Sequence, residues 1–358
     1  MKSASEILLH LSLISGIGPV TIYAIFSAVS DLASIYDYKV NDWTALGVLP
    51  SKAVLLVQGL ADKELLNQEL DLLQKYNISY ISLADKKYPA LLKETYAPPA
   101  VIYWQGIWHD FTAKTLAIVG ARKSNAYAKL CADMIVPEMV EQGWHIVSGG
   151  ALGADAFAHE ATLRANGITI AVLGSGLLHW YPSQNASLFH KIKEQGMLMS
   201  IFPLRTQPLQ GNFPARNRVI AGIAQGCLLL QAEEKSGALI TAKYALEYGR
   251  DVFAVPGPIH DSLSYGSHHL IKQGATLVSC GQDILQTYDF TYNKSEKAVL
   301  EFKEDPDSDL LVHLVHPASL QMLFETTQIP LLDLQERLFN LLLAGKVQQN
   351  SIGLWQRA

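Results

Sequence analysis

Two arginines flank an asparagine at the start of an apolar run, in the segment FPARNRVIAG of residues 213–222. Arg216, Asn217 and Arg218 are followed by the sequence VIAG, which is typical of a buried helix. A guanidinium is costly to bring against an apolar core unless an anion meets it. Two arginines at one helix start exceed what a single buried acid could satisfy. The segment therefore predicts an anion site at a helix N-terminus, and internal pairing of the arginines is the alternative.

Small residues and cations also follow other apolar runs of the chain. Glycine lets the backbone come close to a ligand, and a helix N-terminus offers free N–H donors, so loops of this composition favour an anion. Several neighbouring loops favour a multiply charged anion, and phosphate is the simplest choice. The loops are residues 120–123, 148–153, 174–176, 213–218, 233–238 and 256–257. Their cations are Arg122, Lys123, Arg216, Arg218 and Lys235, with Lys243 inside the helix that follows.

Residues 115–288 alternate between strand and helix patterns. The apolar runs are LAIVG, HIVSG, TIAVLG, LMSIF, CLLLQ, DVFAVPG and TLVSC, and a plausible helix follows each. Continuous apolar strands separated by helices are typical of a parallel sheet that is covered on both faces. The pattern predicts an α/β fold with an extended, Rossmann-like, doubly wound parallel sheet. A ligand of such a sheet binds at the carboxyl ends of the strands, where the loops above lie.

The flanking segments predict two smaller domains. Residues 1–80 form short amphipathic helices, and residues 14–20, ISGIGPV, are typical of a helix-hairpin-helix turn that holds a phosphate. A tight turn in a small helical bundle is the equally weighted alternative. We place the sheet domain at 81–288 and a polar, acidic linker at 289–309.

Residues 310–358 contain helical patterns followed by a hairpin pattern, which are the elements of a winged helix. Their cations are Arg337, Lys346 and Arg357. Three cations are few for a domain that binds in a DNA groove, so a role in protein contact or packing is favoured over groove binding.

Composition places the chain among globular proteins. It has 358 residues, of which 49% are hydrophobic and 17% charged, and is long enough for two or three domains. No apolar run approaches the roughly 18 residues of a membrane span, and Met1-Lys2 is not followed by a signal-peptide core. Cys131, Cys227 and Cys280 are far apart, which favours a reducing compartment. We therefore expect a cytoplasmic protein with no membrane partner.

The net charge of −5 hides an uneven distribution. Residues 114–285 hold 14 Lys and Arg against 12 Asp and Glu, a net charge of +2. Residues 1–113 hold 8 against 11, and residues 286–358 hold 6 against 10. A phosphate backbone interacts with the charge of the surface that it contacts, so a negative net charge of the whole chain is compatible with a polyanionic ligand.

Signatures of common catalytic and cofactor sites are missing from the sequence. Residues 174–176 continue into Leu-Leu-His, so the dinucleotide motif GxGxxG is absent. Lys235 and Ser236 follow two glutamates rather than a glycine, which excludes a Walker A loop. His159-Glu160 resembles the start of HExxH, but Leu163 stands where the second histidine belongs. We therefore expect a binding protein with no catalytic residues, metal or cofactor.

The chain resembles the DNA-processing protein A family (DprA, also called Smf), strongly over residues 85–287 and more loosely beyond them. The matching segments are LAIVGARK, IVSGGALGADAFAH, TIAVLGSG with Tyr181-Pro182 after it, GNFPARNRVIAG, SGALITAKYALEYGRDVFAVPG and GSHHLIKQGA. The pairing of FPxRNRxIAG with SGALITA is specific to this family.

The resemblance implies a single-stranded DNA-binding protein of natural transformation that protects incoming strands and loads the RecA recombinase onto them. It also implies a homodimer formed through the α/β domain, and single-strand-binding protein as a further partner. The implied DNA-binding residues are Gly120, Arg122, Lys123, Gly149, Gly150, Gly174, Ser175, Gly176, Phe213, Arg216, Asn217, Arg218, Ser236, Gly237 and Lys243. Phe213 stacks on a base or packs against the sheet rim. On this interpretation, Arg216→Ala leaves the fold stable and weakens DNA binding.

The sequence departs from the family pattern at Leu152, Ile201 and Gln231, where the family carries an arginine and two acids. Loss of one cation weakens DNA binding, and loss of two acids offsets it. A nucleotide phosphoribohydrolase, which also has a glycine-lined phosphate pocket, is the alternative function. Its PGG-x-GT-x-x-E signature is missing, because Pro256-Gly257 continues as Pro258-Ile259-His260.

Overall fold

A computed structural model describes residues 2–109, 111–112, 114–288, 310–311, 313–314, 317–327, 329–343, 346–350 and 353–357. Residues 1–289 and 290–358 form two compact units. The predicted linker, 289–309, lies outside the described residues. The other predicted domain boundaries stay predictions.

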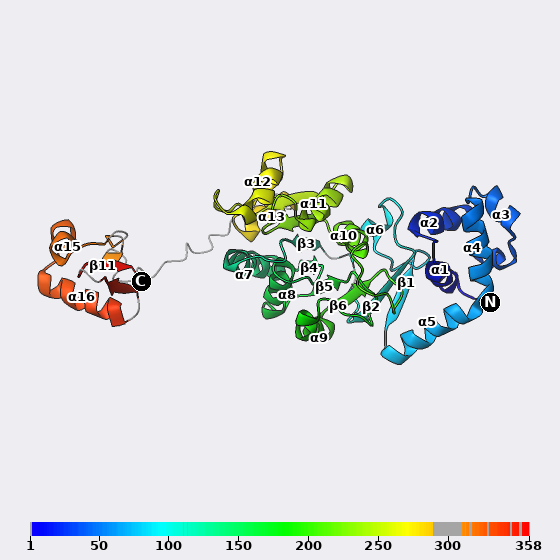
Figure 1. The fold of residues 1–358 in the computed structure, drawn as a ribbon, viewed down its shortest axis with the longest axis horizontal. Coiled ribbons are helices and arrows are strands. Elements are labelled where there is room, and N and C mark those ends of the chain that lie inside the picture. The colour runs from blue at the N-terminus through cyan, green and yellow to red at the C-terminus, as the bar shows by residue number, and fades with distance from the viewer. Residues whose placement is uncertain are drawn as a thin grey trace. The chain divides into compact units, whose positions relative to one another are not determined.

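A nine-stranded sheet lies at the centre of the first unit, in the order β1-β2-β6-β5-β4-β3-β7-β8-β9 (Figure 1). The strands are β1 (Ser79–Ser82), β2 (Val101–Gly106), β3 (Thr115–Val119), β4 (His145–Ser148), β5 (Thr169–Val172), β6 (Met197–Ser200), β7 (Gly226–Leu229), β8 (Asp251–Ala254) and β9 (Thr276–Leu277). The seven strands from β3 to β9 coincide with the seven predicted apolar runs and pair in parallel. The predicted α/β class is therefore confirmed.

The sheet is mostly rather than wholly parallel. β2 pairs antiparallel with both β1 and β6, so two strands that the sequence pattern did not predict extend the sheet past β6. The seven parallel strands run outward from β3 in both directions, and β3 pairs with β7. The strand order therefore reverses between β3 and β7, the position at which a doubly wound sheet binds its ligand.

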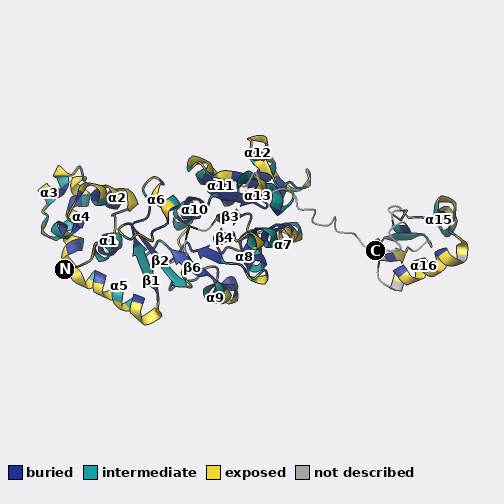
Figure 2. Ribbon diagram, turned by 180° about the vertical axis from the view of Figure 1, so that it is seen from behind, coloured by how far each residue is buried: buried dark blue, intermediate teal, exposed yellow. Residues whose placement is uncertain are grey.

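Helices cover the parallel strands on both faces. α7 (Ala126–Glu141), α8 (Ala154–Arg164) and α9 (Ala186–Gln195) form one layer, and α10 (Asn212–Ile223) and α11 (Gly237–Glu247) pack together on the other side (Figure 1). β3 is buried along its whole length, as a strand covered on both faces must be (Figure 2). The same unit also contains α6 (Ala90–Lys93), α12 (Tyr265–Lys272) and α13 (Gly281–Tyr288), with 3-10 helices at Leu32–Asp37, Ser183–Asn185 and Ser262–Ser264.

Five helices precede the sheet, as the helical pattern predicted. They are α1 (Ala4–Leu13), α2 (Pro19–Ala28), α3 (Val40–Ala45), α4 (Pro50–Ala61) and α5 (Lys63–Tyr76). Ser3 caps α1 with a reciprocal bond to Glu6, and Gly16, with φ +83°, turns the chain toward Pro19 at the start of α2. These helices share one hydrophobic core with the sheet. Their assignment to a SAM or helix-hairpin-helix type stays a prediction.

The second unit has the predicted order of helices followed by a hairpin. α15 (Leu320–Thr327) and α16 (Leu331–Leu343) precede β10 (Val347–Gln349) and β11 (Trp355–Arg357), which pair antiparallel. The unit has its own core of Leu310, Leu314, Ala318, Leu323, Leu334, Leu338, Leu341 and Val347. Residues 351–352, between the two strands, lie outside the described residues, and the winged-helix type stays a prediction.

A buried carboxylate joins the N-terminal helices to the chain that leads into α10. Glu69 lies on α5 with 6% of its surface exposed, and its Oε1 accepts a hydrogen bond of 2.8 Å from the Leu204 backbone N–H. Burial raises the pKa of Glu69 above its usual range, against the effect of this hydrogen bond and of Arg205. The folded protein therefore holds the Glu69 proton more tightly than the unfolded chain does.

Glu69→Gln is expected to stabilise the fold increasingly, relative to wild type, as pH rises. The raised pKa contributes stability that is present below the unfolded-state pKa and is lost as pH rises through the folded-state pKa. Glutamine keeps an acceptor for Leu204 and carries no charge at any pH. Thermal unfolding between about pH 4 and pH 8 measures the difference in midpoint between variant and wild type. Glu64→Gln, an exposed change on the same helix, is the control. A difference that does not grow with pH contradicts the prediction.

Candidate functional site

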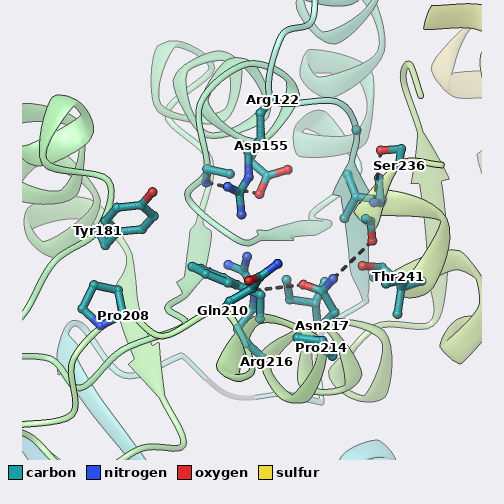
Figure 3. Close-up of a pocket in the computed structure, with 18 residues that line it drawn as sticks. Arg122, Asp155, Tyr181, Pro208, Gln210, Pro214, Arg216, Asn217, Ser236 and Thr241 are labelled. Atoms are coloured by element: carbon teal, nitrogen blue, oxygen red, sulfur yellow. Dashed lines mark hydrogen bonds between the residues drawn. The ribbon is translucent and has the colours of Figure 1, made fainter. Parts of the chain in front are cut away.

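A pocket of about 570 Å³ opens at the predicted edge of the sheet (Figure 3). It lies past the carboxyl end of β3 and beside the N-termini of α10 and α11. Tyr181 and Pro208 lie on one side of it, and Ser236 and Thr241 lie on the opposite side. Seven of the predicted site residues line it: Gly120, Arg122, Phe213, Arg216, Asn217, Ser236 and Gly237. The structure thus brings together three of the predicted loops, residues 120–123, 213–218 and 233–238, which are far apart in the sequence.

Arg216 lies at the base of the pocket and is only 5% exposed. Its guanidinium Nη1 donates to the backbone carbonyl of Gly149 and, at 2.7 Å, to that of Val172. Its Nε donates to the Asn217 Oδ1 at 3.0 Å. Arg216 thus forms hydrogen bonds with several internal partners. Internal pairing of the arginines was the alternative to an anion site in the sequence analysis. A further contact between Arg216 and phosphate stays a prediction.

The buried Asp155 carboxylate interacts electrostatically with this guanidinium. Burial raises the pKa of Asp155, and the positive charge of Arg216 opposes that rise, as do hydrogen bonds from the N–H groups of Gly149 (3.1 Å) and Ala151 (3.2 Å). Burial likewise lowers the pKa of Arg216 to about 10, and Asp155 opposes that change. Each charge therefore favours the ionised form of the other, against the effect of burial.

Gly149 leaves the space that this buried pair needs. A side chain there would overlap the Arg216 guanidinium and place its Cβ 2.7 Å from the Asp155 carboxylate. Gly120 is constrained in a similar way, because a Cβ would lie 2.5 Å from the Ala154 side chain. These two glycines are thus required by close packing around the pocket, as the loop composition predicted.

Arg122 differs from Arg216 because it is exposed at the mouth of the pocket. Its guanidinium carbon lies 5.0 Å from the centre of the Phe213 ring, and that of Arg216 lies 5.8 Å from the same ring. The ring also covers Gly174, where an added Cβ would come within 2.7 Å of it. Phe213 therefore packs between cations and the sheet rim. Tyr181, whose ring lies 5.9 Å from that of Phe213, is 42% exposed and is the more accessible aromatic.

Asn217 ties the start of α10 to the start of α11. Its Nδ2 donates to the backbone carbonyl of Gly237 at 3.3 Å, and its Oδ1 receives Arg216. Ser236 caps α11 by accepting from the Ala238 N–H at 3.3 Å. A Cβ on Gly237 would meet nothing within 4 Å, so the first turn of α11 opens into the pocket. A helix N-terminus of this kind attracts an anion.

The other predicted residues lie around the pocket rather than on its lining. Lys123 is exposed beside Arg122. Gly150, with φ +67°, packs against Phe189, and Gly176 packs against the carbonyls of residues 203 and 204. The hydroxyl of Ser175 donates to the His179 carbonyl at 2.5 Å. These glycine and serine positions shape the loops, and any direct contact with a ligand stays a prediction.

Two predicted cations point to other parts of the surface. Arg218 donates to the Tyr248 hydroxyl at 3.1 Å and to the Tyr96 backbone carbonyl at 2.9 Å. Lys243 is 75% exposed on α11 and lies 3.8 Å from Glu247. Neither belongs to the pocket lining.

Several lining residues were not among the predicted site residues. Tyr181, Pro208, Gln210 and Thr241 complete the walls of the pocket, and Asp155 lies at its base. Pro208 and Gln210 come from the irregular segment ahead of α10, where sequence periodicity carries no signal. The Tyr-Pro pair was visible as a motif, but only the fold places its ring beside Phe213.

The departures from the family pattern have identifiable places. Leu152 is 38% exposed and lines a smaller cavity next to Arg122. Gln231 is buried, where its Oε1 accepts from the Asn125 N–H (3.2 Å) and its Nε2 donates to the Asn125 Oδ1 (3.1 Å). Gln231 therefore holds the loop between β3 and α7, which carries Arg122, through a pair of bonds that a carboxylate could not form. Ile201 is half-buried.

Among the described residues, no group of three or more His, Cys, Asp and Glu is placed to hold a metal ion. In the same part of the chain, no helix has the length and apolar character that a membrane crossing needs. His159, the start of the HExxH-like segment, is fully buried, and burial lowers its pKa to about 3.

The sequence profile of the DNA recombination-mediator protein A family matches residues 79–289. Protein Smf of Synechocystis is 37% identical over 285 residues, which cover 76% of this chain and 70% of that protein. DNA processing protein DprA of Bacillus subtilis is 40% identical over 217 residues, 60% of this chain and 72% of that protein. These matches confirm the resemblance that the motifs carried.

Two solved structures resemble the fold. The X-ray structure of DNA processing protein A from Streptococcus pneumoniae has a TM-score of 0.71 at 32% identity, covering 81% of this chain and all of that chain. The structure of DNA processing protein A from Helicobacter pylori, described for its single-stranded DNA binding mode, has a TM-score of 0.53 at 28% identity. It covers 59% of this chain and 95% of that chain.

Arg216→Ala is now expected to destabilise the fold, in contrast to the expectation from sequence. The change leaves the carbonyls of Gly149 and Val172 without a donor and Asp155 without its buried countercharge, a loss of about 3–5 kcal/mol. Denaturant unfolding measures it. Arg164→Ala, which removes an arginine paired at the surface with Asp133, is the control and is expected to cost about 1 kcal/mol or less. Equal stability of the Arg216 variant and wild type would mean that Arg216 has no structural role.

Proposed function

Because the chain belongs to the DNA recombination-mediator protein A family, we propose that it binds single-stranded DNA. The observation that carries the proposal is one pocket that is lined by Arg122, by Arg216 and by the first turn of α11. In this proposal the protein acts in natural transformation, where it protects incoming strands and loads the RecA recombinase onto them. It works in the cytoplasm as a homodimer, alongside single-strand-binding protein.

The chemistry of the pocket supports a phosphate ligand. Its exposed cation, Arg122, can form two parallel hydrogen bonds to one phosphate, and the start of α11 adds backbone donors. The acid at the base, Asp155, is already bonded by two backbone N–H groups and neutralised by Arg216. Asp155 is therefore already engaged within the protein, and the exposed Arg122 remains available to a ligand.

The shape of the site supports a single strand over a duplex. A recess of about 570 Å³ admits one nucleotide unit, whereas a duplex keeps its bases stacked inside the helix. The exposed ring of Tyr181 offers a stacking partner that accepts any base. The similarity to the Helicobacter pylori protein, described for single-stranded DNA binding, supports the same ligand.

The alternative, a phosphoribohydrolase, has less support from the geometry. Such an enzyme needs an acid within reach of the glycosidic bond. Asp155, the acid on the pocket lining, is buried and serves Arg216, while Glu233 and Glu234 are exposed on the loop ahead of α11 and do not line the pocket. We therefore retain binding as the function.

Binding to a labelled single strand and to the matched blunt duplex tests the proposal. The single strand is expected to bind more tightly at each salt concentration, with little dependence on base sequence, because phosphate and ring contacts carry no sequence information. Fluorescence anisotropy at two salt concentrations measures both affinities. Equal affinity for the duplex contradicts the proposal.

Arg122→Ala is expected to weaken single-strand binding by roughly tenfold or more and to leave the thermal midpoint unchanged. Arg122 is exposed, so its loss removes a phosphate contact without opening the core. The slope of log K against log salt should flatten by about 0.7 for the lost contact. Lys129→Ala, which removes an exposed α7 cation paired with Asp133, is the control for net charge. A slope that changes equally in both variants would assign the effect to overall charge.

A further inference from the structure

Tyr96 is one of the most exposed large side chains of the first unit. It follows α6, and 71% of its surface is accessible. It lines a small cleft of about 50 Å³ together with Arg218 and Tyr248. A tyrosine that packs in a core hides its ring, so packing does not account for this one. We call this feature the Tyr96 cleft.

Arg218 organises the Tyr96 cleft. Its two hydrogen bonds hold the Tyr248 hydroxyl and the Tyr96 backbone carbonyl, and its guanidinium carbon lies 5.6 Å from the centre of the Tyr244 ring. The Tyr244 and Tyr248 rings stack at 6.2 Å with an interplanar angle of 14°. A planar cation and three tyrosines are thus gathered in one place from α10, α11 and the chain after α6.

The Tyr96 cleft continues from the pocket along α11. Gly237 and Thr241 line the pocket, and Tyr244 and Tyr248 follow at helical spacing on the same side of the helix. At a rise of about 1.5 Å per residue, the two tyrosines lie roughly 10 and 16 Å along α11 from Gly237. Stacked nucleotides are about 3.4 Å apart, so this path corresponds to roughly three to five nucleotides.

Charges around the Tyr96 cleft are compatible with a polyanion. Of the described residues that line the cleft, Arg218 is the charged one. Glu94 and Glu247, which stand next to lining residues in the sequence, lie 3.9 Å from Arg250 and 3.8 Å from Lys243, respectively. Arg218 adds a positive charge to these two pairs. A strand that passes the cleft therefore meets a net positive charge beside aromatic rings, the combination that binds single strands without sequence preference.

We propose that the Tyr96 cleft is a second contact for single-stranded DNA, which holds the strand as it leaves the pocket along α11. Tyr96 stacks on a base, and Arg218 holds the tyrosines in place and attracts the backbone. This inference rests on the proposed function and adds the path of the strand and a minimum length for full affinity. The cleft contributes only when the strand extends roughly three to five nucleotides beyond the pocket.

Binding of two labelled oligothymidylates, of about 3 and about 15 nucleotides, tests the inference by fluorescence anisotropy, because the shorter strand ends before it reaches the cleft. Wild type is expected to bind the longer strand more tightly. Tyr96→Ala is expected to lower affinity for the longer strand by roughly fivefold or more and to leave the shorter one unchanged, because a lost stacking contact acts only where the strand reaches it. Tyr96→Phe, which keeps the ring, is expected to match wild type.

Tyr76→Ala is the matched control, because Tyr76 is 43% exposed on α5 and also has a neighbouring cation, Lys75, 5.4 Å from its ring. It is expected to bind both strands as wild type does. Wild-type affinity of Tyr96→Ala for the longer strand overturns the inference and leaves the proposed function standing. An equal loss of affinity for both strands overturns it as well, because Tyr96 would then act at the pocket or through the stability of the fold. If wild type binds neither strand, the proposed function fails and the inference fails with it.

Discussion

The buried guanidinium of Arg216 is the interaction on which the site depends. One side chain from α10 bonds the carbonyls of Gly149 and Val172, which lie at the ends of two neighbouring strands. A cation at this depth needs full hydrogen bonding and a countercharge, so the loops must turn carbonyls inward and Asp155 must lie close by. The same requirement excludes a side chain at Gly149. The strand ends and α10 are therefore held in one arrangement.

This arrangement separates two roles that look alike in the sequence. Arg216 is held inside and fixes the architecture, whereas Arg122 stands at the mouth of the pocket. Both guanidinium groups lie near the Phe213 ring, so one aromatic side chain contacts the inner and the outer cation. Asn217 bonds both Arg216 and the Gly237 carbonyl, and so links the arginines to the open first turn of α11. The proposed anion site is therefore preorganised, because its donors are held in place before any ligand arrives.

Much of the fold could be predicted, because strands buried on both faces leave a strong local pattern. The run LAIVG became the fully buried β3, and the glycine-rich loops after the strands met at one edge of the sheet. The antiparallel pair β1 and β2 was not predicted, since pairing at a sheet edge depends on distant partners rather than on local composition. Within the site, Gln210 and Tyr181 were missed because irregular segments have no periodicity that points a side chain.

The sequence by itself determined the class of fold, the family and a set of loops that line the pocket, because apolar periodicity and glycine at strand ends are local properties. Only the tertiary structure decided which arginine is buried and which is exposed at the pocket. Arg216 and Arg218 are two residues apart, yet one is buried against strand ends and the other organises the tyrosines of α11. Helical geometry turns such residues to different sides, and what each side meets depends on the packing of distant elements.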